Sequence, residues 1–419
     1  MTEHATIGFI ADDITGATDQ ASALAVRGLS ARVVFADDTP ISADTDAVVV
    51  ARKIRSIPAD EACRSALQAA AALRAAGATR LFSKYCSTFD STADGNIGPI
   101  ADALLDATGA RLVVHCPAYP ANKRTVYLGY LFVGDELLSE SPMRNHPLNP
   151  MTDAQLLRVL GAQTDRDVGL LPLTTIDGGT DAVTRHLAQL EAAGVRHVIA
   201  DAIHAPDLET IAATAATGAV AAGSAAFGAA FAAAALRRPL GTGADPERAR
   251  LPEGPAAMLA GSMSQATRQQ VAEFGDGALT LSVAEMVDGD AALERAAALM
   301  GGGTDSEPIL ISTDFDPASP RGAAEGMAHD EVARSIERTM GRLATELVRL
   351  GVRRLIVAGG ETSGAVADAL ALQSARMGPD ISVGVPWMVA DDRELAVAFK
   401  SGNFGGPTFF RDALEVADR

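Results

Sequence analysis

The stretch TIGFIADDITGATDQASALAVRG, from Thr6 to Gly28, decides the fold class of this chain. It opens with a short apolar run, Thr6–Ala11, which is typical of a buried strand. A helical pattern, Thr15–Arg27, follows at once and stops at Gly28, a residue type that often ends a helix. Because a strand leading directly into a helix is half of a βαβ unit, the segment predicts an α/β fold.

The same alternation of apolar runs and helical patterns continues through the first half of the chain. Further strands are expected at Arg32–Ala36, Ala47–Ala51, Arg80–Ser83, Arg111–Cys116, Val168–Leu171 and His197–Ala200. The helices Pro58–Ala76 and Asn96–Thr108 fit between them, and each is followed by a glycine. The uncharged stretch Thr210–Leu236 is rich in Ala and Gly rather than Leu, Ile and Phe, which favours buried helices over a membrane span.

A segment dense in Pro, Gly and charge, Arg237–Pro255, is predicted to link two domains. Beyond it, strands are expected at Ala256–Ala260, Ala278–Ser282, Ile309–Ser312, Arg354–Ala358 and Ile381–Val385, with helices near Gln265–Phe274, Ala291–Met300, Glu331–Leu350 and Ser363–Leu372 and a loop at Thr313–Ala328. We therefore predict two α/β domains, residues 1–240 and 241–419, with mainly parallel sheets flanked by helices and an active site in the interdomain cleft.

Charge and cysteine content narrow the range of partners. The net charge of -18 at pH 7 over 419 residues repels phosphate backbones and anionic lipids, and the sequence has no basic run that would overcome it. Three cysteines, Cys63, Cys86 and Cys116, lack metal-ligand spacing and are odd in number, which favours reduced thiols and a cytoplasmic location. We expect a small-molecule substrate, with no nucleic acid and no membrane as partner.

Two carboxylates, Asp12 and Asp13, come directly after the first predicted strand. Open α/β sheets bind their ligands at the carboxyl ends of strands, so this pair is a candidate for binding a substrate hydroxyl or for general-base work. An alternative is that one of them, or Thr15, caps the following helix. Arg52 with Lys53, and Lys84, follow two other predicted strands and would suit an anionic substrate, although surface solvation is the usual fate of such residues.

A polar loop runs from Lys84 to Thr92 and is followed by the glycines of GNIGP before a helix. Its hydroxyls and its carboxylate suit a polyol or an acid bound at the amino end of that helix, while the alternative is ordinary turn chemistry. The residues concerned are Ser87, Thr88, Asp90, Ser91 and Thr92. A long non-periodic stretch, Cys116–Met151, is also typical of a functional loop. Either His115 or His146 would suit a base, but a structural role is more common for a single histidine.

Three loops that contain glycine follow predicted strands in the second half. The clearest, AGGETSGAV at 358–366, joins a strand to a helix and would let backbone N–H groups approach phosphate oxygens. It is not a Walker A loop, and the sequence has no GxGxxG dinucleotide fingerprint. The other two loops are AGSMS at 260–264 and KSGNFG at 400–405. All three loops could bind one nucleotide together; the alternative is that each is an ordinary turn without a ligand.

Motifs that match one family cover nearly the whole chain. They are IADDITGATD, KYCSTFDST with GNIGP, CPAYPANKRTVYLGYLFVGDELLSES with MRNHPLNPMTD, LAGSMS, AGGETSGAV and FKSGNFG. Together they resemble the four-carbon acid sugar kinase family, and within it the 3-oxo-tetronate kinases. The loop CSTFDST is longer than in the threonate kinases of the broader family and favours the 3-oxo-tetronate branch by resemblance. Met263 and Asn149 depart from the family pattern, and neither removes an assigned polar group.

The resemblance implies transfer of the γ-phosphoryl group of ATP to the C4 hydroxyl of a 3-oxo-tetronate, with threonate or erythronate as alternative acceptors. It implies an acid-sugar-binding domain at 1–240 and a nucleotide-binding domain at 241–419. Asp12 or Asp13 would orient the attacking hydroxyl, and Arg52, Lys84 and the loop to Thr92 would bind the acid. The implied ATP-binding residues are Ser262, Gly360, Glu361, Thr362, Ser363, Gly402 and Asn403.

Mg²⁺ would bridge the phosphates and keep several waters, with no protein metal ligand assigned. A homodimer is the assembly we expect. Two rival classes stay open at this point: a nicotinamide-dependent dehydrogenase, which the missing dinucleotide fingerprint disfavours, and a non-catalytic sensor of acid sugars, which would bind the acid but release no ADP.

Overall fold

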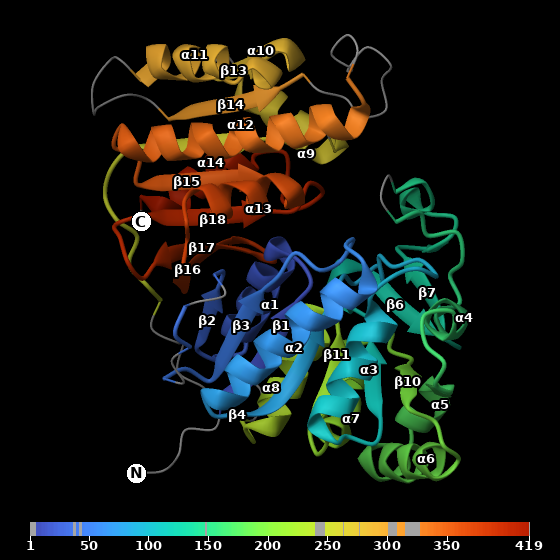
Figure 1. Ribbon diagram of the computed structural model, residues 1–419. Coiled ribbons are helices and arrows are strands. Elements are labelled where there is room, and N and C mark those ends of the chain that lie inside the picture. The colour runs from blue at the N-terminus through green and yellow to red at the C-terminus, as the bar shows by residue number, and fades with distance from the viewer. Residues whose placement is uncertain are drawn as a thin grey trace. The chain divides into compact units, whose positions relative to one another are not determined.

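The chain forms two compact units, Met1–Pro246 and Glu247–Arg419, in a computed structural model (Figure 1). The structure describes residues 6–36, 39–41, 44–146, 149–238, 248–262, 264–275, 277–300, 308–314 and 327–418. Each unit is a mostly parallel sheet with helices against it, so the predicted α/β class is confirmed. The predicted boundary between residues 240 and 241 lies outside the described residues and stays a prediction.

The first unit is built on a parallel sheet with the strand order β2-β3-β1-β4-β11-β5-β10-β9. Its strands are β1 (Thr6–Ala11), β2 (Ala31–Val34), β3 (Ala47–Ala51), β4 (Ala78–Lys84), β5 (Val113–Cys116), β9 (Val168–Leu171), β10 (His197–Ala200) and β11 (Val220–Gly223). The chain order is reversed on the two sides of β1, which lies between β3 and β4. This is the kind of switch point where open α/β sheets bind ligands.

Helices cover both faces of this sheet. They are α1 (Ile14–Val26), α2 (Ala59–Ala75), α3 (Ile97–Thr108), α4 (Leu156–Gly161), α5 (Leu173–Ile176), α6 (Thr180–Ala192), α7 (Ala205–Ala215) and α8 (Ala225–Ala235). Gly8 lies against Leu73 of α2, whereas the ring of Phe9 contacts that of Phe82, which contacts Phe227 of α8. Because successive strand residues point to opposite faces, α2 and α8 lie on opposite sides of the sheet.

The second unit is a sheet with the strand order β13-β14-β12-β15-β18-β17-β16. Its elements are β12 (Ala256–Ala260), α9 (Gln265–Phe274), β13 (Ala278–Leu281), α10 (Val283–Asp288), α11 (Asp290–Met300), β14 (Ile309–Thr313), α12 (His329–Arg349), β15 (Arg354–Ala358), α13 (Gly360–Ala369), β16 (Ser374–Ser382), β17 (Val385–Ala390), β18 (Ala396–Lys400) and α14 (Phe409–Ala417). The pairs from β13 to β18 are parallel, and β17 is antiparallel to both its neighbours β18 and β16. Helix α12 runs along α13 in Figure 1, and the buried Trp387 of β17 donates to the carbonyl oxygen of Ala413 in α14.

Two expectations about the chain path were wrong, and two further features, the strand β18 and a small sheet within Cys116–Met151, were not predicted. The stretch Thr210–Leu236 is not all helix, because β11 lies in its middle and pairs with β4 and β5. The predicted strand Ile381–Val385 instead spans the turn between β16 and β17, and β18 was not predicted. The long stretch Cys116–Met151 contains a small antiparallel sheet of β6 (Arg124–Tyr127), β7 (Tyr130–Val133) and β8 (Glu136–Leu137), with 3-10 turns at Pro120–Asn122 and Pro142–Asn145.

Some predictions fall on residues that the structure does not describe. Residues 239–247 of the predicted linker Arg237–Pro255 and residues 315–326 of the predicted loop Thr313–Ala328 lie outside the described residues, as does Met263. Among the helices in the described ranges, none is both long enough and apolar enough to cross a membrane.

Candidate active site

The acidic pair Asp12 and Asp13 lies between the end of β1 and the start of α1. In the sheet, Ala11 pairs with Ala51 of β3 on one side and with Lys84 of β4 on the other. The residues that follow these three strands therefore meet at one edge. Backbone hydrogen bonds continue past the strand ends: the N–H of Asp12 donates to the carbonyl oxygen of Lys84 at 3.0 Å.

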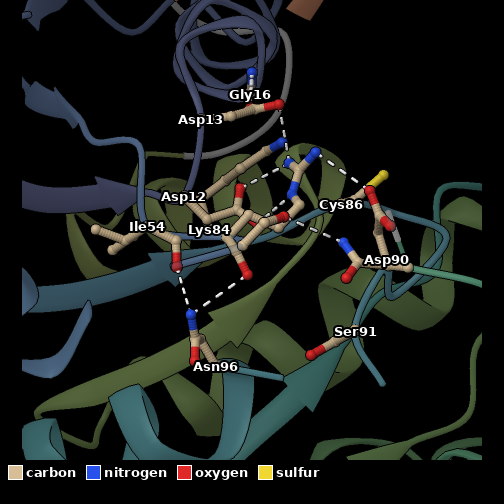
Figure 2. Close-up of polar contacts among 12 residues, drawn as sticks. Asp12, Asp13, Gly16, Ile54, Lys84, Cys86, Asp90, Ser91 and Asn96 are labelled. Carbon is tan, nitrogen blue, oxygen red and sulfur yellow. Dashed lines mark hydrogen bonds and ion pairs between the residues drawn. The ribbon is translucent and has the colours of Figure 1, made fainter. Parts of the chain in front are cut away.

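One guanidinium, that of Arg55, joins three carboxylates at this edge. Its Nε and Nη2 donate to the two oxygens of Asp12 at 2.8 and 2.9 Å, so this contact is bidentate. Its Nη2 lies 3.0 Å from Oδ2 of Asp13, and its Nη1 donates to Oδ2 of Asp90 at 3.3 Å. Figure 2 shows Asp12, Asp13 and Asp90 pointing toward this common centre. The side chain of Arg55 is only 21% exposed, so the cluster is largely withdrawn from water.

Arg55 is a candidate site residue that the sequence analysis did not single out. It is the third cation in the run Arg52, Lys53, Arg55 after β3, and only the first two were singled out. The guanidinium of Arg52 donates to the carbonyl oxygen of Ala51 at 2.8 Å, and Lys53 is exposed. Three cationic residues in four positions already indicate that one of them could bind the carboxylates. The sequence does not say which of the three side chains turns toward them.

The buried Asn96, just before α3, holds the backbone around Arg55. Its Nδ2 donates to the carbonyl oxygen of Ile54 at 2.7 Å, as Figure 2 shows, and to that of Ile57 at 2.8 Å. A third contact from the same nitrogen reaches the carbonyl oxygen of Arg55 itself at 3.3 Å. The path of the loop after β3 therefore depends on a residue from the GNIGP motif.

Asp13 has a second role besides its contact with Arg55. Its Oδ1 accepts from the N–H of Gly16 and its Oδ2 from the hydroxyl of Thr15, so Asp13 is the N-cap of α1. The interpretation that one of the two carboxylates caps the helix is therefore confirmed for Asp13. Asp12 does not cap α1.

The two neighbouring carboxyls differ in their pKa. Burial raises the pKa of Asp12 above its usual value, although the neighbouring Arg55 lowers it. Burial also raises the pKa of Asp13, but Arg55, Lys84 and the hydrogen bonds from Gly16 and Thr15 leave that pKa below its usual value. Paired acids whose environments move their pKa values apart are suited to different roles. Asp12 also lines a small pocket, formed by Asp12, Ile54, Arg55, Ser83, Tyr85, Asp90, Ser91, Asn96, Ile97 and Ile100.

Lys84 is a buried cation beside this cluster. Its Nζ lies 3.7 Å from Oδ2 of Asp19 in α1, and a Cβ on Gly16 would approach that Nζ to 2.7 Å. Gly16 thus leaves room for the ammonium group at the first turn of α1. Burial raises the pKa of Asp19 to about 6, and Lys84 offsets part of this shift.

The polar loop after Lys84 is only partly turned toward Arg55. Asp90 is buried and reaches Arg55, whereas the hydroxyl of Ser91 accepts from Nε2 of Gln163 at 2.9 Å. Thr88 is buried and its hydroxyl lies 2.9 Å from Sγ of Cys86, while Ser87 and Thr92 are half-buried. Of the predicted acid-binding residues, the structure therefore places Asp90 on the guanidinium, and the binding roles of the others stay predictions.

The two histidines singled out by sequence differ in their surroundings. His115 is fully buried, its Nε2 lies 3.1 Å from Nδ1 of His197, and Nε2 of His197 lies 2.9 Å from Asp102. Burial, with His197 next, holds the pKa of His115 well below its usual value, so this ring is neutral. Nδ1 of His146 accepts from the backbone N–H of Asn149 at 3.1 Å.

In the second unit, the three glycine-containing loops meet. They follow β12, β15 and β18, where Ala260, Ala358 and Lys400 are adjacent in register. A Cβ on Gly402 would lie 2.4 Å from Oγ of Ser262, and a Cβ on Gly359 would lie 3.1 Å from the backbone nitrogen of Ser262. Only residues without a side chain allow these loops to approach so closely.

The loop after β15 has the features of an anion site. Gly359 has φ of 126°, a conformation that other residues rarely adopt, and helix α13 starts directly behind it. The exposed Gly360 and Glu361 begin the helix, Thr362 is buried, and the fully buried hydroxyl of Ser363 has no hydrogen-bond partner among the described residues. Helix amino ends with a glycine turn bind phosphate through backbone N–H groups.

The loop after β18 is tied to the loop after β12. The carbonyl oxygen of Gly402 accepts from the hydroxyls of Ser264 and Thr267, and Asn403 is exposed next to it. In the part of the chain that the structure describes, no group of three or more His, Cys, Asp or Glu side chains is arranged to hold a metal ion.

Comparison with known proteins assigns a role to each unit. A family model described as a sugar-binding N-terminal domain matches residues 7–231, and one described as a nucleotide-binding C-terminal domain matches residues 257–410. A 3-oxo-tetronate kinase of Burkholderia multivorans is 44% identical, covering 98% of this chain and 97% of the relative. One of Cupriavidus necator is 42% identical, covering 97% and 96%. A crystal structure of a Haemophilus influenzae protein superposes with a TM-score of 0.79 at 37% identity, covering 98% of this chain and all of that one.

Proposed function

The chain belongs to the four-carbon acid sugar kinase family, whose members join a sugar-binding to a nucleotide-binding domain, and we propose that it is an ATP-dependent 3-oxo-tetronate kinase. The reaction transfers the γ-phosphoryl group of ATP to the C4 hydroxyl of the acid and releases ADP. Relatives from several bacteria that carry this name, at about 40% identity over nearly the full chain, support the assignment.

One observation carries the proposal: two sites of different chemistry lie in the two matched regions. The cluster of Arg55 with three carboxylates, beside the buried Lys84, lies within the region that matches the sugar-binding model. The converging glycine loops lie within the region that matches the nucleotide-binding model. A kinase needs one site for a small hydroxyl-bearing acid and another for a polyphosphate, and it needs little covalent chemistry from the protein.

In the sugar-binding unit, Asp12 is our candidate for the residue that orients and deprotonates the attacking hydroxyl. It faces the pocket, does not cap α1, and has a raised pKa, which brings a carboxylate closer to the proton it must accept. Asp13 would position Arg55 and the start of α1. Lys84 and Arg52 would bind the carboxylate and oxo end of the acid as a point charge and a fork, respectively.

In the nucleotide-binding unit, backbone N–H groups of residues 360–362 and 402–403 would hold the phosphates, together with the hydroxyl of Ser262. The buried, unpartnered hydroxyl of Ser363 and the open space at Gly360 fit this role. Mg²⁺ bound together with the nucleotide would neutralise part of the charge of its phosphates.

Direct transfer requires the hydroxyl and the γ-phosphorus to be bound at the same time. We therefore expect intersecting lines in initial-rate plots against both substrates, rather than the parallel lines of a ping-pong mechanism.

The test is a coupled ADP assay on the purified chain with a panel of four-carbon acids. The panel contains 3-oxo-tetronates of both configurations together with threonate and erythronate, and the phosphorylated oxygen of each product is mapped. We expect the highest kcat/KM for a 3-oxo-tetronate, with phosphate on C4. Preference for threonate or erythronate would favour the alternative acceptors, and acid binding without ADP release would replace the kinase by a sensor.

A further inference from the structure

A lysine at the end of β18, Lys400, is fully buried in the second unit. Its side chain is among the largest that the described part of the chain hides completely from solvent. Lysine is almost never fully buried without a charged partner, because an ammonium group loses its hydration there. The position of Lys400 is also notable, since it directly precedes the loop Ser401–Gly406 that lies against Ser262.

The ammonium group is surrounded by neutral oxygen atoms. Nζ of Lys400 donates to the hydroxyl of Thr267 at 3.1 Å and to the carbonyl oxygens of Ser401 at 3.1 Å, Gly402 at 3.0 Å and Phe404 at 3.2 Å. The ring of Phe409, at the start of α14, lies 5.7 Å from it. Helix α9 contributes Thr267 and the neutral Gln270, and no described carboxylate lies within ion-pair distance of Nζ.

A second buried side chain holds the same loop without carrying charge. Nε2 of Gln270 donates to the carbonyl oxygens of Phe404, Gly405 and Gly406 at 3.0 to 3.1 Å. Two buried side chains, those of Lys400 and Gln270, therefore donate hydrogen bonds to the loop Ser401–Gly406. Of these two, only Lys400 can carry a positive charge.

No negatively charged side chain among the described residues neutralises the ammonium group of Lys400, so a bound anion would be its first charged partner. Burial lowers the pKa of Lys400 to about 7, and no neighbouring charge contributes to this shift. At neutral pH a large share of the side chains is thus deprotonated in the free protein. A polyphosphate bound next to Ser262 and Gly402 would favour the charged form, since an anion close to an amine raises the pKa of that amine.

We propose that Lys400 is a positioning residue of the nucleotide site, which holds the loop Ser401–Gly406 through its carbonyl oxygens and takes up a proton when the nucleotide binds. Binding and protonation are then linked: the proton stabilises the bound polyphosphate, and the polyphosphate stabilises the proton on Nζ. This inference rests on the proposed function, because it needs a nucleotide at these loops.

The experiment is isothermal titration calorimetry of the full chain with Mg²⁺ and ADP, without the acid. Titrations at pH 7.5 in two buffers of different ionisation enthalpy give the number of protons taken up per nucleotide. With a pKa of about 7 in the free protein, Lys400 accounts for roughly three-quarters of a proton if binding charges it fully. ADP and Mg²⁺ contribute their own proton exchange, so the quantity that matters is the difference between variants.

Two variants separate the effect of the Lys400 charge from the effect of hydrogen bonds to the loop Ser401–Gly406. Lys400→Gln keeps a hydrogen-bond donor but has no charge to gain, and we expect it to lose this proton uptake and to raise the KM for ATP about tenfold or more. The KM for the acid should not change. The matched control, Gln270→Met, removes the uncharged side chain that donates hydrogen bonds to the same loop. It should retain the proton uptake even if it binds the nucleotide more weakly.

The results distinguish this inference from the proposed function. If the wild-type chain binds ADP and Lys400→Gln takes up as many protons, or binds as tightly, the role of Lys400 is refuted while the kinase stands. If the wild-type chain neither binds ADP nor produces it, both fail. Should Lys400→Gln not fold, the wild-type pH series decides. Proton uptake that grows from pH 6.5 to 8 supports the role of Lys400, and the absence of proton uptake above pH 7.5 refutes it, because proton release by the nucleotide's phosphate fades over that range.

Discussion

Replacing Arg55 by Met is the perturbation that tests the centre of the candidate site most directly. The substitution keeps an unbranched apolar stem but removes the guanidinium that Asp12, Asp13 and Asp90 share. Three carboxylates would then lie together without their common cation. We expect a large loss of stability in the first unit and a loss of kinase activity.

The magnitude follows from the burial of the cluster. The side chain of Arg55 is 21% exposed, and those of Asp12, Asp13 and Asp90 are 11%, 23% and 6% exposed. Removing one partner from a buried ion pair costs about 3–5 kcal/mol, and the bidentate contact to Asp12 places Arg55→Met in this range. As a matched control, Arg111→Met removes a 2.8 Å pair with Glu191 whose arginine is 79% exposed, and such surface pairs contribute less than about 1 kcal/mol.

The cost should also depend on pH, with a definite sign. Without Arg55 the carboxyl pKa values in the folded state rise above their unfolded values, so the folded state binds more protons than the unfolded state. Stability of the variant is then gained as pH falls, and the difference from the wild type shrinks between pH 7.5 and pH 5.5.

Urea unfolding at both pH values measures this. All four tyrosines, Tyr85, Tyr119, Tyr127 and Tyr130, lie in the first unit and the single tryptophan, Trp387, lies in the second, so their optical signals report the two units separately. A loss below about 1 kcal/mol in the tyrosine-reported transition, equal to that of Arg111→Met, would refute the central role of Arg55.

Three further predictions concern the proposed general base, the nucleotide loop and a buried histidine. Asp12→Asn should lower kcat by about 10²-fold or more with an unchanged KM for ATP, as for loss of a general base, whereas steady-state turnover equal to that of the wild type would exclude this role. Gly359→Ala places a side chain at φ of 126° and costs about 1–3 kcal/mol of strain, so the KM for ATP should rise about tenfold while the KM for the acid stays constant. The pKa of His115 is held well below its usual value in the folded state, so the unfolded state binds the extra proton and the free energy of unfolding should fall as pH drops below about 6.5. His115→Gln should flatten this decline in urea titrations between pH 5 and pH 8, and an unchanged slope would contradict the assignment.

Local sequence patterns predicted most of the sheet that carries the site. Thr6–Ala11, Ala47–Ala51, Ala256–Ala260 and Arg354–Ala358 are strands with the expected bounds, because each is an apolar run between clear turn signals. The strand β11 was missed because its sequence, VAAG, has low strand propensity. It is a strand because β4 and β5 supply hydrogen-bond partners on both sides, which is tertiary information.

The sequence by itself determined the fold class, the family, and the place of Asp12 and Asp13 at a strand end, since these depend on periodicity and on motifs that are contiguous in the chain. The tertiary structure alone decided that Arg55, rather than Arg52 or Lys53, meets those carboxylates, because the loop after β3 is held by Asn96, a residue far along the chain. It likewise decided that Lys400 is buried among carbonyl oxygens. Which way a side chain turns, and how much water it keeps, depends on neighbours that folding brings together from distant positions.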